Sequence, residues 1–351
     1  MGVDLLQVPA LQSPNAARAL LLGVHAAGAR LIAVGERGIV VFSDDEGATW
    51  TQGQVPVSVT LASVFLVSDK LGWAAGHDGA VLKTTDGGKS WSKVMDGNRA
   101  NALVIDDLKA RIEAAKSEAD AGLEGADVRL EALQMRLEDV EAGASFGPSR
   151  PLLGLWFEDE RRGYVVGAFG QIFRTTDGGQ NWNSLSGALP NPDSLHLNSI
   201  ARIAEIGLVI SGERGAVWVS KDDGKSWSLR ETGYDGHLYG VLRTSAGALL
   251  AYGFAGNLFR SDDGGQSWRA LPRTTDKSFV GGLNLANGDV VLVARNGRVI
   301  ASKDGGATFG GLDIGAGRAV ASVLPVPFGK DKLVAAGTGG VSVVTLANER
   351  K

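Results

Sequence analysis

The eight residues Thr84-Thr85-Asp86-Gly87-Gly88-Lys89-Ser90-Trp91 decide the fold, because nearly the same eight occur six times along the chain. The shared pattern is Ser/Thr-x-Asp-x-Gly-x-(Ser/Thr/Asn)-aromatic. The copies occupy residues 43–50, 84–91, 175–182, 220–227, 261–268 and 302–309. Their starts lie 41, 91, 45, 41 and 41 residues apart. A repeat of about 40–45 residues predicts the blades of a β-propeller.

The residues around each box predict four short strands. In the second copy we expect these strands at 61–67, 72–76, 80–84 and 91–95, where apolar or alternating runs are separated by turn residues. A turn with glycine at its corners precedes each box by eight residues. Four strands per period is the structure of one propeller blade.

The same glycine turn occurs a seventh time, at 337–340, with no box after it. The sequence therefore predicts an all-β fold, a seven-bladed β-propeller that forms a single domain over residues 1–351. We expect a strand at 4–8 to supply the missing outer strand of the seventh blade. Such a closure would leave no open sheet edge where the ring meets itself.

Residues 102–142 interrupt the repeat between the second and third predicted blades. They are rich in Ala, Glu and Leu and contain no Pro. Apolar residues recur at helical spacing before Gly122 and after Gly125, which predicts an antiparallel helical hairpin with helices of about 16 to 20 residues. Residues 103–141 contain five Lys/Arg and eleven Asp/Glu, so the hairpin carries the acidity of a chain whose net charge is −4.

Composition excludes several classes of protein. The chain has no cysteine, so disulfides, thiolate nucleophiles and cysteine metal sites are impossible. A net charge of −4 argues against a general nucleic-acid binder, and no apolar run is long enough to span a bilayer. We expect no cofactor and no metal ion. The first residues lack the pattern of a signal peptide, which fits a cytoplasmic chain or a mature form restarted on Met-Gly.

The boxes themselves are expected to be structural. The aspartate can accept hydrogen bonds from the turn, and the final aromatic residue can pack between neighbouring blades. The predicted structural residues are Asp45, Asp86, Asp177, Asp222, Asp263, Asp304, Trp50, Trp91, Trp182, Trp227 and Trp268. In a propeller these turns lie on the face opposite the glycine turns.

The other face carries the candidate partner-binding residues. Aligning the residues that lead into each first strand, and adding the tips of the glycine turns, gives a mostly cationic ring. Its members are Arg18, Arg37, Arg150, His196, Arg214, His237, Lys277, Arg295 and Arg318. Such a ring would attract an acidic segment or an anionic headgroup. The alternative is that these long polar side chains only solvate the loop ends.

The hairpin also has two interpretations. It is either an exposed decoration whose single apolar seam is closed on itself, or a docking arm for another protein. Since it leaves from a connection between blades, we expect it on the same face as the glycine turns.

The boxes are identified as Asp-box, or BNR, repeats, which sialidases and several non-catalytic propellers share. The run Gly-Trp-Ala-Ala-Gly-His-Asp-Gly at 72–79, followed by the box at 84–91, resembles the photosystem II stability and assembly factor family. The resemblance implies an exported, non-enzymatic protein that binds membrane-protein partners. The long helical insertion favours the non-photosynthetic bacterial branch, for which the resemblance suggests association with RND-type lipid or hydrophobe transporters.

We therefore expect a periplasmic accessory or assembly subunit, as a mature form without its signal peptide, that docks on an RND-type transporter through the hairpin and the basic face. A photosystem-type assembly factor is one alternative. The other is a sialidase-like glycoside hydrolase, for which Tyr234 and Tyr239 are the only plausible nucleophiles. No Arg-Ile-Pro motif occurs, because Arg18 is followed by Ala19 and Leu20.

Overall fold

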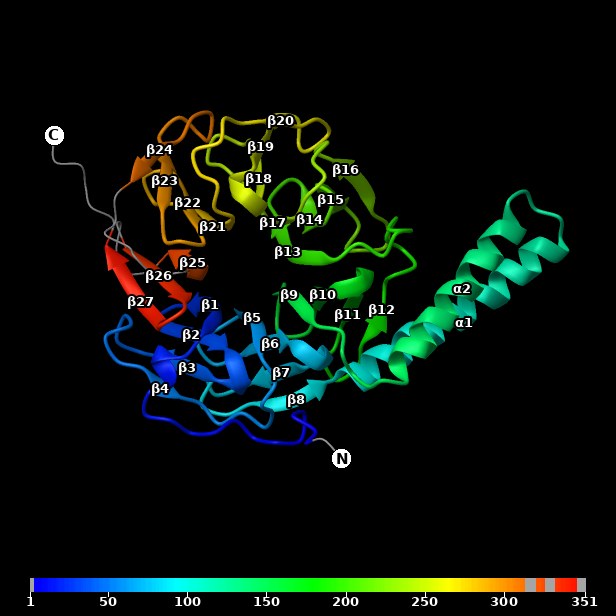
Figure 1. Ribbon diagram of the computed structural model, residues 1–351, viewed down its shortest axis with the longest axis horizontal. Helices are drawn as coiled ribbons and strands as arrows, with labels where there is room; N and C mark the ends of the chain where they lie inside the picture. The colour runs from blue at the N-terminus through cyan, green and yellow to red at the C-terminus, as the bar shows by residue number, and fades with distance from the viewer. Residues whose placement is uncertain (1–2, 313–319, 326–331, 346–351) are drawn as a thin grey trace.

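Seven antiparallel sheets form a ring around a central opening in the computed structural model, which describes residues 3–312, 320–325 and 332–345 (Figure 1). The first strands of successive sheets contact one another in chain order, and the first strand of the last sheet contacts that of the first. This closed ring is consistent with a β-propeller. The prediction of a mostly β chain with two helices between its sheets is therefore confirmed.

Each sheet is a meander whose strands pair in chain order. The first three sheets contain β1 (Leu21–Ala27), β2 (Arg30–Gly35), β3 (Val40–Ser43) and β4 (Thr51–Gln52); β5 (Leu61–Leu66), β6 (Gly72–Gly76), β7 (Val81–Thr84) and β8 (Ser92–Met95); and β9 (Leu152–Phe157), β10 (Gly163–Gly167), β11 (Ile172–Thr175) and β12 (Asn183–Ser184).

The next three sheets contain β13 (Leu197–Ile203), β14 (Gly207–Gly212), β15 (Ala216–Ser220) and β16 (Ser228–Glu231); β17 (Leu238–Arg243), β18 (Leu249–Gly253), β19 (Leu258–Ser261) and β20 (Arg269–Ala270); and β21 (Phe279–Asn284), β22 (Val290–Ala294), β23 (Val299–Ser302) and β24 (Gly310–Leu312). Within the described ranges the last sheet has three strands, β25 (Val320–Pro325), β26 (Lys332–Gly337) and β27 (Gly340–Thr345).

Four of the glycine turns contain a short 3₁₀ helix, and a fifth such helix precedes the first sheet. They are η1 (Ala16–Arg18), η2 (Glu36–Gly38), η3 (His77–Gly79), η4 (Ala168–Gly170) and η5 (Phe254–Gly256). The turns of the fourth, sixth and seventh sheets lack one. In six of the seven turns the third residue and the final glycine both have positive φ, for example Arg37 at 52° and Gly38 at 71°; in the turn at 294–297 only Gly297 does. We call the face of the ring that carries these turns the tip face, and the opposite face the box face.

Each box folds its own turn through the aspartate carboxylate. In the second copy, Thr84 Oγ1 and the Ser90 N–H donate to Asp86 Oδ1, both at 2.9 Å, and Ser90 Oγ donates to Asp86 Oδ2 at 2.5 Å. The other five boxes repeat this network. Hydrogen bonds from Thr49 lower the pKa of Asp45 to about 2, so this carboxylate stays charged.

The boxes also join neighbouring sheets. At four seams a backbone carbonyl of a box accepts a hydrogen bond from a side chain of the preceding sheet. The donors and acceptors are Arg30 and Gly87 at 2.7 Å, Trp73 and Gly178 at 3.2 Å, Lys83 and Gly178 at 3.0 Å, Tyr164 and Asp223 at 2.8 Å, and Arg260 and Gly305 at 2.6 Å. Trp73 also stacks on Phe157 of the next sheet, with ring centroids 3.6 Å apart. The turn therefore fixes both its own sheet and the seam before it.

The box tryptophans lie in or beside these seams. Trp91, Trp182 and Trp227 are buried, and Trp50 and Trp268 are half-buried against apolar clusters that span two sheets. Burial of their rings is the main apolar contribution of each box.

The expected strand at 4–8 does not form, and these residues do not extend the last sheet. The Ser58 N–H donates to Leu5 O, and Ser58 Oγ donates to Val8 O, both at 2.8 Å. Leu6 is buried with Val55 and Val57, so the segment follows the second sheet (Figure 1). The prediction was wrong because it rested only on the need to cover the edge of the last sheet. It did not consider that Leu6 could be buried in an apolar cluster elsewhere.

The seam between the last and first sheets is instead closed by packing. Leu21, Leu31 and Ala33 form one apolar cluster with Val334 and Ala336. This cluster joins β1 and β2 to β26, and η1 contacts β27. Within the described residues, the ring therefore closes without a shared strand.

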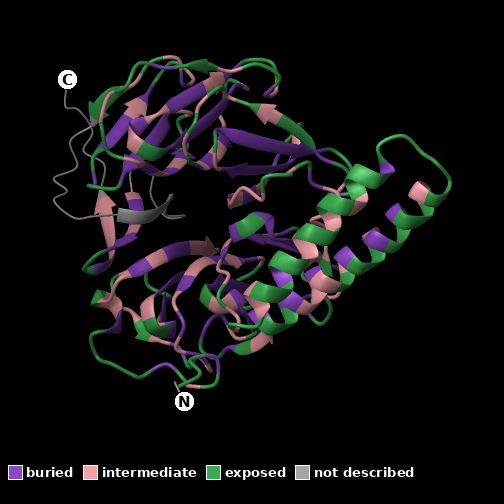
Figure 2. Ribbon diagram, turned by 45° about the vertical axis from the view of Figure 1, so that its right-hand side comes forward, coloured by how far each residue is buried: buried purple, intermediate pink, exposed green. Residues whose placement is uncertain are grey.

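The insertion forms α1 (Gly97–Asp120) and α2 (Ala126–Ala144), which lie side by side and project from the ring (Figure 1). The helix α1 begins before the predicted Ala102 because Asp96 accepts the Arg99 N–H at 3.2 Å and caps it. The start of α1 lies against η3, where Gly97 approaches Gly79. Figure 2 shows that exposed residues follow the hairpin outward, while buried residues concentrate in the strands.

The base of the hairpin belongs to the core. Val104 and Leu108 of α1 and Val140 of α2 are buried in one cluster with Trp73 and Phe157. The hairpin is therefore anchored between the second and third sheets, and only its outer part is an independent arm.

The box network gives a stability prediction. Replacing Asp86 with alanine removes three hydrogen bonds and leaves the Ser90 N–H without its acceptor, so we expect the free energy of unfolding to fall by about 1–3 kcal/mol. Asp86→Asn keeps one carbonyl acceptor and is expected to cost less. Urea unfolding measures both, with Asp69→Ala on an exposed loop as the control. Equal stability of the Asp86→Ala and control proteins would contradict the role of the carboxylate.

A second prediction concerns acid. His25 lies in β1, its ring centroid is 4.4 Å from that of Phe65, and its Nδ1 accepts the Leu66 N–H at 3.2 Å. Burial lowers the pKa of His25 from 6.5 to about 4. The unfolded chain binds this proton at higher pH than the folded protein, so the free energy of unfolding should decrease as pH falls from 6.5 to 4, by on the order of 2–3 kcal/mol.

Urea unfolding at about pH 7 and about pH 4.5 tests the effect. His25→Asn preserves an acceptor but cannot titrate, so it should lose less stability between the two pH values than the wild-type protein. His237→Asn, at a more exposed site, is the control. An unchanged pH dependence in His25→Asn would show that the carboxylates alone cause the acid effect.

Candidate partner-binding site at the axial cavity

The inner surface of the ring is built from a repeated backbone irregularity. In all seven of the described first strands, β1, β5, β9, β13, β17, β21 and β25, the pairing with the next strand skips one residue near the start, and the first six of these bulges shape the cavity. A bulge leaves the extra residue unpaired and re-aims its side chain. In the first six strands the skipped residues are Leu22, Ala62, Leu153, Asn198, Tyr239 and Val280, and all six line one axial cavity.

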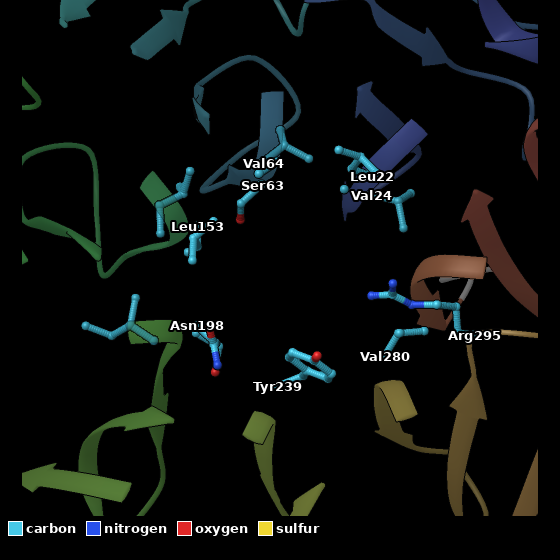
Figure 3. A pocket seen from close by; sticks show the side chains of 15 residues that line it. Leu22, Val24, Ser63, Val64, Leu153, Asn198, Tyr239, Val280 and Arg295 are labelled. Atoms are coloured by element: carbon cyan, nitrogen blue, oxygen red, sulfur yellow. The ribbon is translucent and has the colours of Figure 1, made fainter. Parts of the chain in front are cut away.

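The cavity has a volume of about 300 Å³ and an uneven lining. Leu22 and Leu153 supply apolar surface on one side, whereas Asn198 and Tyr239 supply polar groups on the other (Figure 3). The side chain of Arg295 points into the opening from the turn before β23 (Figure 3). The lining described here contains no carboxylate. It can therefore accept an extended segment with apolar and hydrogen-bonding groups and one negative charge.

The predicted cationic ring is only partly in register. The N–H of the second residue of each glycine turn donates to the carbonyl of the residue that leads into the first strand, and these acceptors are Leu20, Thr60, Pro151, His196, His237 and Ser278. The structure thus places His196 and His237 at equivalent positions. Arg150 and Lys277 precede the equivalent position by one residue and Arg18 by two, and Arg318 lies outside the described residues. The prediction assumed equal loop lengths, which differ by one or two residues.

The three turn arginines divide between two positions. Arg37 and Arg214 are the third residues of their turns, with positive φ, and neither belongs to the cavity lining; Arg214 pairs with Asp193 at 2.6 Å. Arg295 is the second residue of its turn and reaches the cavity. Lys277 pairs with the neighbouring Asp276 at 2.9 Å, and Arg18 ends η1 beside the last sheet.

Glu213 organises the tip face beside the cavity. Its Oε2 lies 2.9 Å from His196 Nδ1 and accepts the His196 N–H at 2.7 Å, and its Oε1 lies 3.7 Å from His237 Nε2. Burial opposes its ionisation, but the His196 N–H and the two imidazoles outweigh burial and lower the pKa of Glu213. The carboxylate therefore holds both histidines in place while reducing the positive charge that the ring was expected to carry.

Aromatic and cationic contacts extend this group in both directions. The ring of Phe169 lies 4.9 Å from that of His196, and the Arg150 guanidinium lies 5.1 Å above Phe169. Burial lowers the pKa of Arg150. On the other side, His237 stacks with Tyr239, whose side chain lines the cavity. A continuous row thus runs from Arg150 across the tip face into the axial cavity. We call it the tip row, and its members are Arg150, Phe169, His196, Glu213, His237 and Tyr239.

Sequence reasoning missed part of this arrangement. Asn198 and the role of Tyr239 depend on the bulges, which alternate patterning does not reveal. Phe169 could have been noticed, since a large apolar residue at the tip of a glycine turn is unusual, and it is half-exposed. Glu213 is absent from the residues predicted for this face, which were chosen for positive charge.

Among the described residues, no group of His, Asp or Glu side chains is arranged to hold a metal ion. No described helix combines the length and the hydropathy that a bilayer-spanning helix needs.

Comparison with known proteins places part of the chain near one family. A profile described as Photosynthesis system II assembly factor YCF48 matches residues 147–301, less than half of the chain. Photosystem II assembly lipoprotein Ycf48 of Synechococcus sp. (strain CC9902) is 36% identical over 76 residues, which span 22% of this chain and 22% of that protein. All residues of the tip row, and Arg295, lie inside the segment that the family profile matches.

Solved structures extend the likeness to nearly the whole fold. YCF48 bound to D1 peptide aligns with 97% of this chain and 100% of its own at 18% identity and a TM-score of 0.65. YCF48 from Cyanidioschyzon merolae aligns with 95% and 97%, at 15% identity and 0.63. Virginiamycin B lyase from Staphylococcus aureus aligns with 94% and 96%, at 11% identity and 0.65. At these identities the structures show a shared fold alone, and one fold serves both binding proteins and enzymes.

Proposed function

We propose that this protein is a non-enzymatic assembly factor that binds an extended, negatively charged segment of a membrane-protein partner where the tip row meets the axial cavity. The observation that carries the proposal is the continuity of one surface. The tip row leads from the Arg150 guanidinium over aromatic and imidazole rings to Tyr239, with the Glu213 carboxylate already engaged between the two imidazoles, and Arg295 also lines the cavity. This surface falls within the segment that resembles an assembly-factor family.

The shape of the surface suits a peptide better than a compact ligand. Aromatic faces and a guanidinium placed in a row can contact successive residues of an extended chain, and one buried end can receive a terminal or side-chain carboxylate. Because YCF48 has been solved with a D1 peptide on a propeller of the same fold, a protein segment is a ligand that this architecture can accept.

The identity of the partner is a separate part of the proposal. The similarities to YCF48 support the photosystem-type assembly role better than docking on an RND-type transporter. The transporter, and the periplasm as the compartment, stay predictions from sequence resemblance. Affinity capture from the native membrane fraction distinguishes a photosystem subunit from a transporter.

Absence of catalysis is also proposed. A sialidase-like reaction needs a tyrosine nucleophile with carboxylate partners and an arginine cluster. Tyr239 faces a cavity with one arginine and no carboxylate in its described lining, and the Tyr234 hydroxyl donates to Phe254 O at 3.3 Å and accepts from Asn257 at 3.0 Å. Neither tyrosine has the surroundings that the reaction requires.

The binding prediction uses a short fluorescent peptide that carries Asp and Glu among Ser, Leu and Gly. We expect Arg295→Ala and Arg150→Ala each to weaken its binding by about 10- to 100-fold, because a charge-assisted contact is lost. Fluorescence anisotropy gives the affinities, and thermal unfolding verifies that the variants are folded.

The matched control is Arg269→Ala, which removes an exposed arginine on β20 away from the tip row. It should bind the peptide as the wild-type protein does. The same peptide with Lys in place of Asp and Glu should bind weakly. Equal loss in Arg269→Ala and Arg295→Ala would mean that net charge alone drives binding, and the proposal would fail.

For the enzyme alternative we expect no hydrolysis of a fluorogenic sialoside above the uncatalysed rate. The measurement is release of the fluorophore at high protein concentration. Turnover that Tyr239→Phe abolishes would overturn the non-enzymatic proposal.

A further inference from the structure

The helix α2 has apolar residues on two opposite sides. One side, with Leu133, Leu137 and Val140, packs toward α1 and the ring. The other contains Val128, Ala132, Met135 and Ala142, and Asp139 occupies the position between Met135 and Ala142 that continues the same spacing. A hairpin that closes its seam on itself requires only the first side, so the second side has no function in the hairpin's own folding.

The second side is open to solvent. Val128 is 70% exposed and Met135 61%, and Phe146, just beyond the end of α2 and four residues after Ala142, is 88% exposed. We call Val128, Ala132, Met135, Ala142 and Phe146 the outer stripe. Isolated exposed apolar residues are ordinary, but a stripe at this spacing along one helix is the pattern that a second helix packs against.

The two edges of the outer stripe differ in charge. Along one edge lie Asp127, Glu131 and Glu138, which form no ion pair within the described part of the chain. Along the other edge the cations are already engaged, because Arg129 pairs with Glu118 and Arg136 donates to Ser194 of the ring. The stripe thus presents apolar contacts beside an uncompensated acidic row.

We propose that the outer stripe of α2 docks an amphipathic helix of a partner protein whose apolar side is bordered by Lys or Arg. Charge complementarity chooses this occupant. Cations on the incoming helix would face Asp127, Glu131 and Glu138, as flanking charges do in coiled coils. A second copy of this chain would bring the two acidic edges together if the helices packed antiparallel. If they packed in parallel, each acidic edge would face the edge whose arginines are already engaged.

The length of the stripe sets the size of the partner helix. Val128 and Ala142 are 14 residues apart, about 21 Å at 1.5 Å per residue. A helix of about four turns covers that distance. The outer stripe is separate from the tip row, so the inference goes beyond the proposed function. A negative result for the outer stripe would leave the proposed function of the tip row unaffected.

The test uses the full-length protein and two designed helical peptides with the same Leu and Ala stripe, one bordered by Lys and Arg and one by Glu. We expect the basic peptide to bind and the acidic one not to bind, by fluorescence anisotropy. Val128→Gln with Met135→Gln should weaken binding by at least about tenfold, because two apolar side chains lose their contacts. Leu123→Gln, at an exposed apolar position in the turn between the helices, is the matched control and should bind normally.

A second part of the experiment tests charge with the double variant Glu131→Gln and Glu138→Gln. This variant should bind the basic peptide more weakly, and its binding should depend less on salt. Equal binding of the two peptides, equal effects of the stripe and control variants, or no binding of the basic peptide would each overturn the proposal. Sedimentation that shows a dimer lost in the stripe variant would identify a second copy as the occupant instead. The acidic peptide used for the tip row is measured in parallel, and its binding should be unchanged in the stripe variants.

Discussion

Four of the seven seams in the ring depend on a hydrogen bond between a side chain of one sheet and a backbone carbonyl in the box of the next. Each box turn is held by its own aspartate, and the fixed turn presents a carbonyl to Arg30, Trp73, Tyr164 or Arg260 of the preceding sheet. An isolated sheet of four short strands has little core of its own. The repeated turn therefore does for the seams what a shared strand does in other closed sheets, and apolar packing suffices where the last sheet meets the first.

Structure and binding are separated along this scaffold. The residues that repeat lie on the box face and in the seams, whereas the residues that differ from blade to blade lie at the bulges, the glycine turns and the hairpin. Tyr239, Asn198 and Arg295 occupy positions where other blades carry leucine, alanine or glutamate. A repeat protein whose residues differ from blade to blade on one surface is well suited to recognition, because the backbone that supports those residues does not depend on their identity.

Most of the architecture could be predicted from sequence because its cause is periodic. The box and the glycine turn set the strand boundaries, and β5, β6, β7 and β8 lie within one residue of their expected ends. The features that were predicted wrongly are those that do not repeat along the chain. The path of residues 4–8 depends on a tertiary apolar contact of Leu6, the start of α1 on the cap by Asp96, and the register of the cationic ring on loop lengths. The bulges that shape the site leave no mark in a pattern of apolar and polar residues.

The bulge has a consequence for how such a protein can change over time. Because the extra residue makes no ladder hydrogen bond, its side chain can be exchanged with little effect on pairing in the strand. Six such positions converge on a single axis. A few substitutions among them would convert an apolar conduit into a polar one while every seam and turn stayed as it is. Ligand preference in this ring can therefore change between relatives while their backbones still superpose.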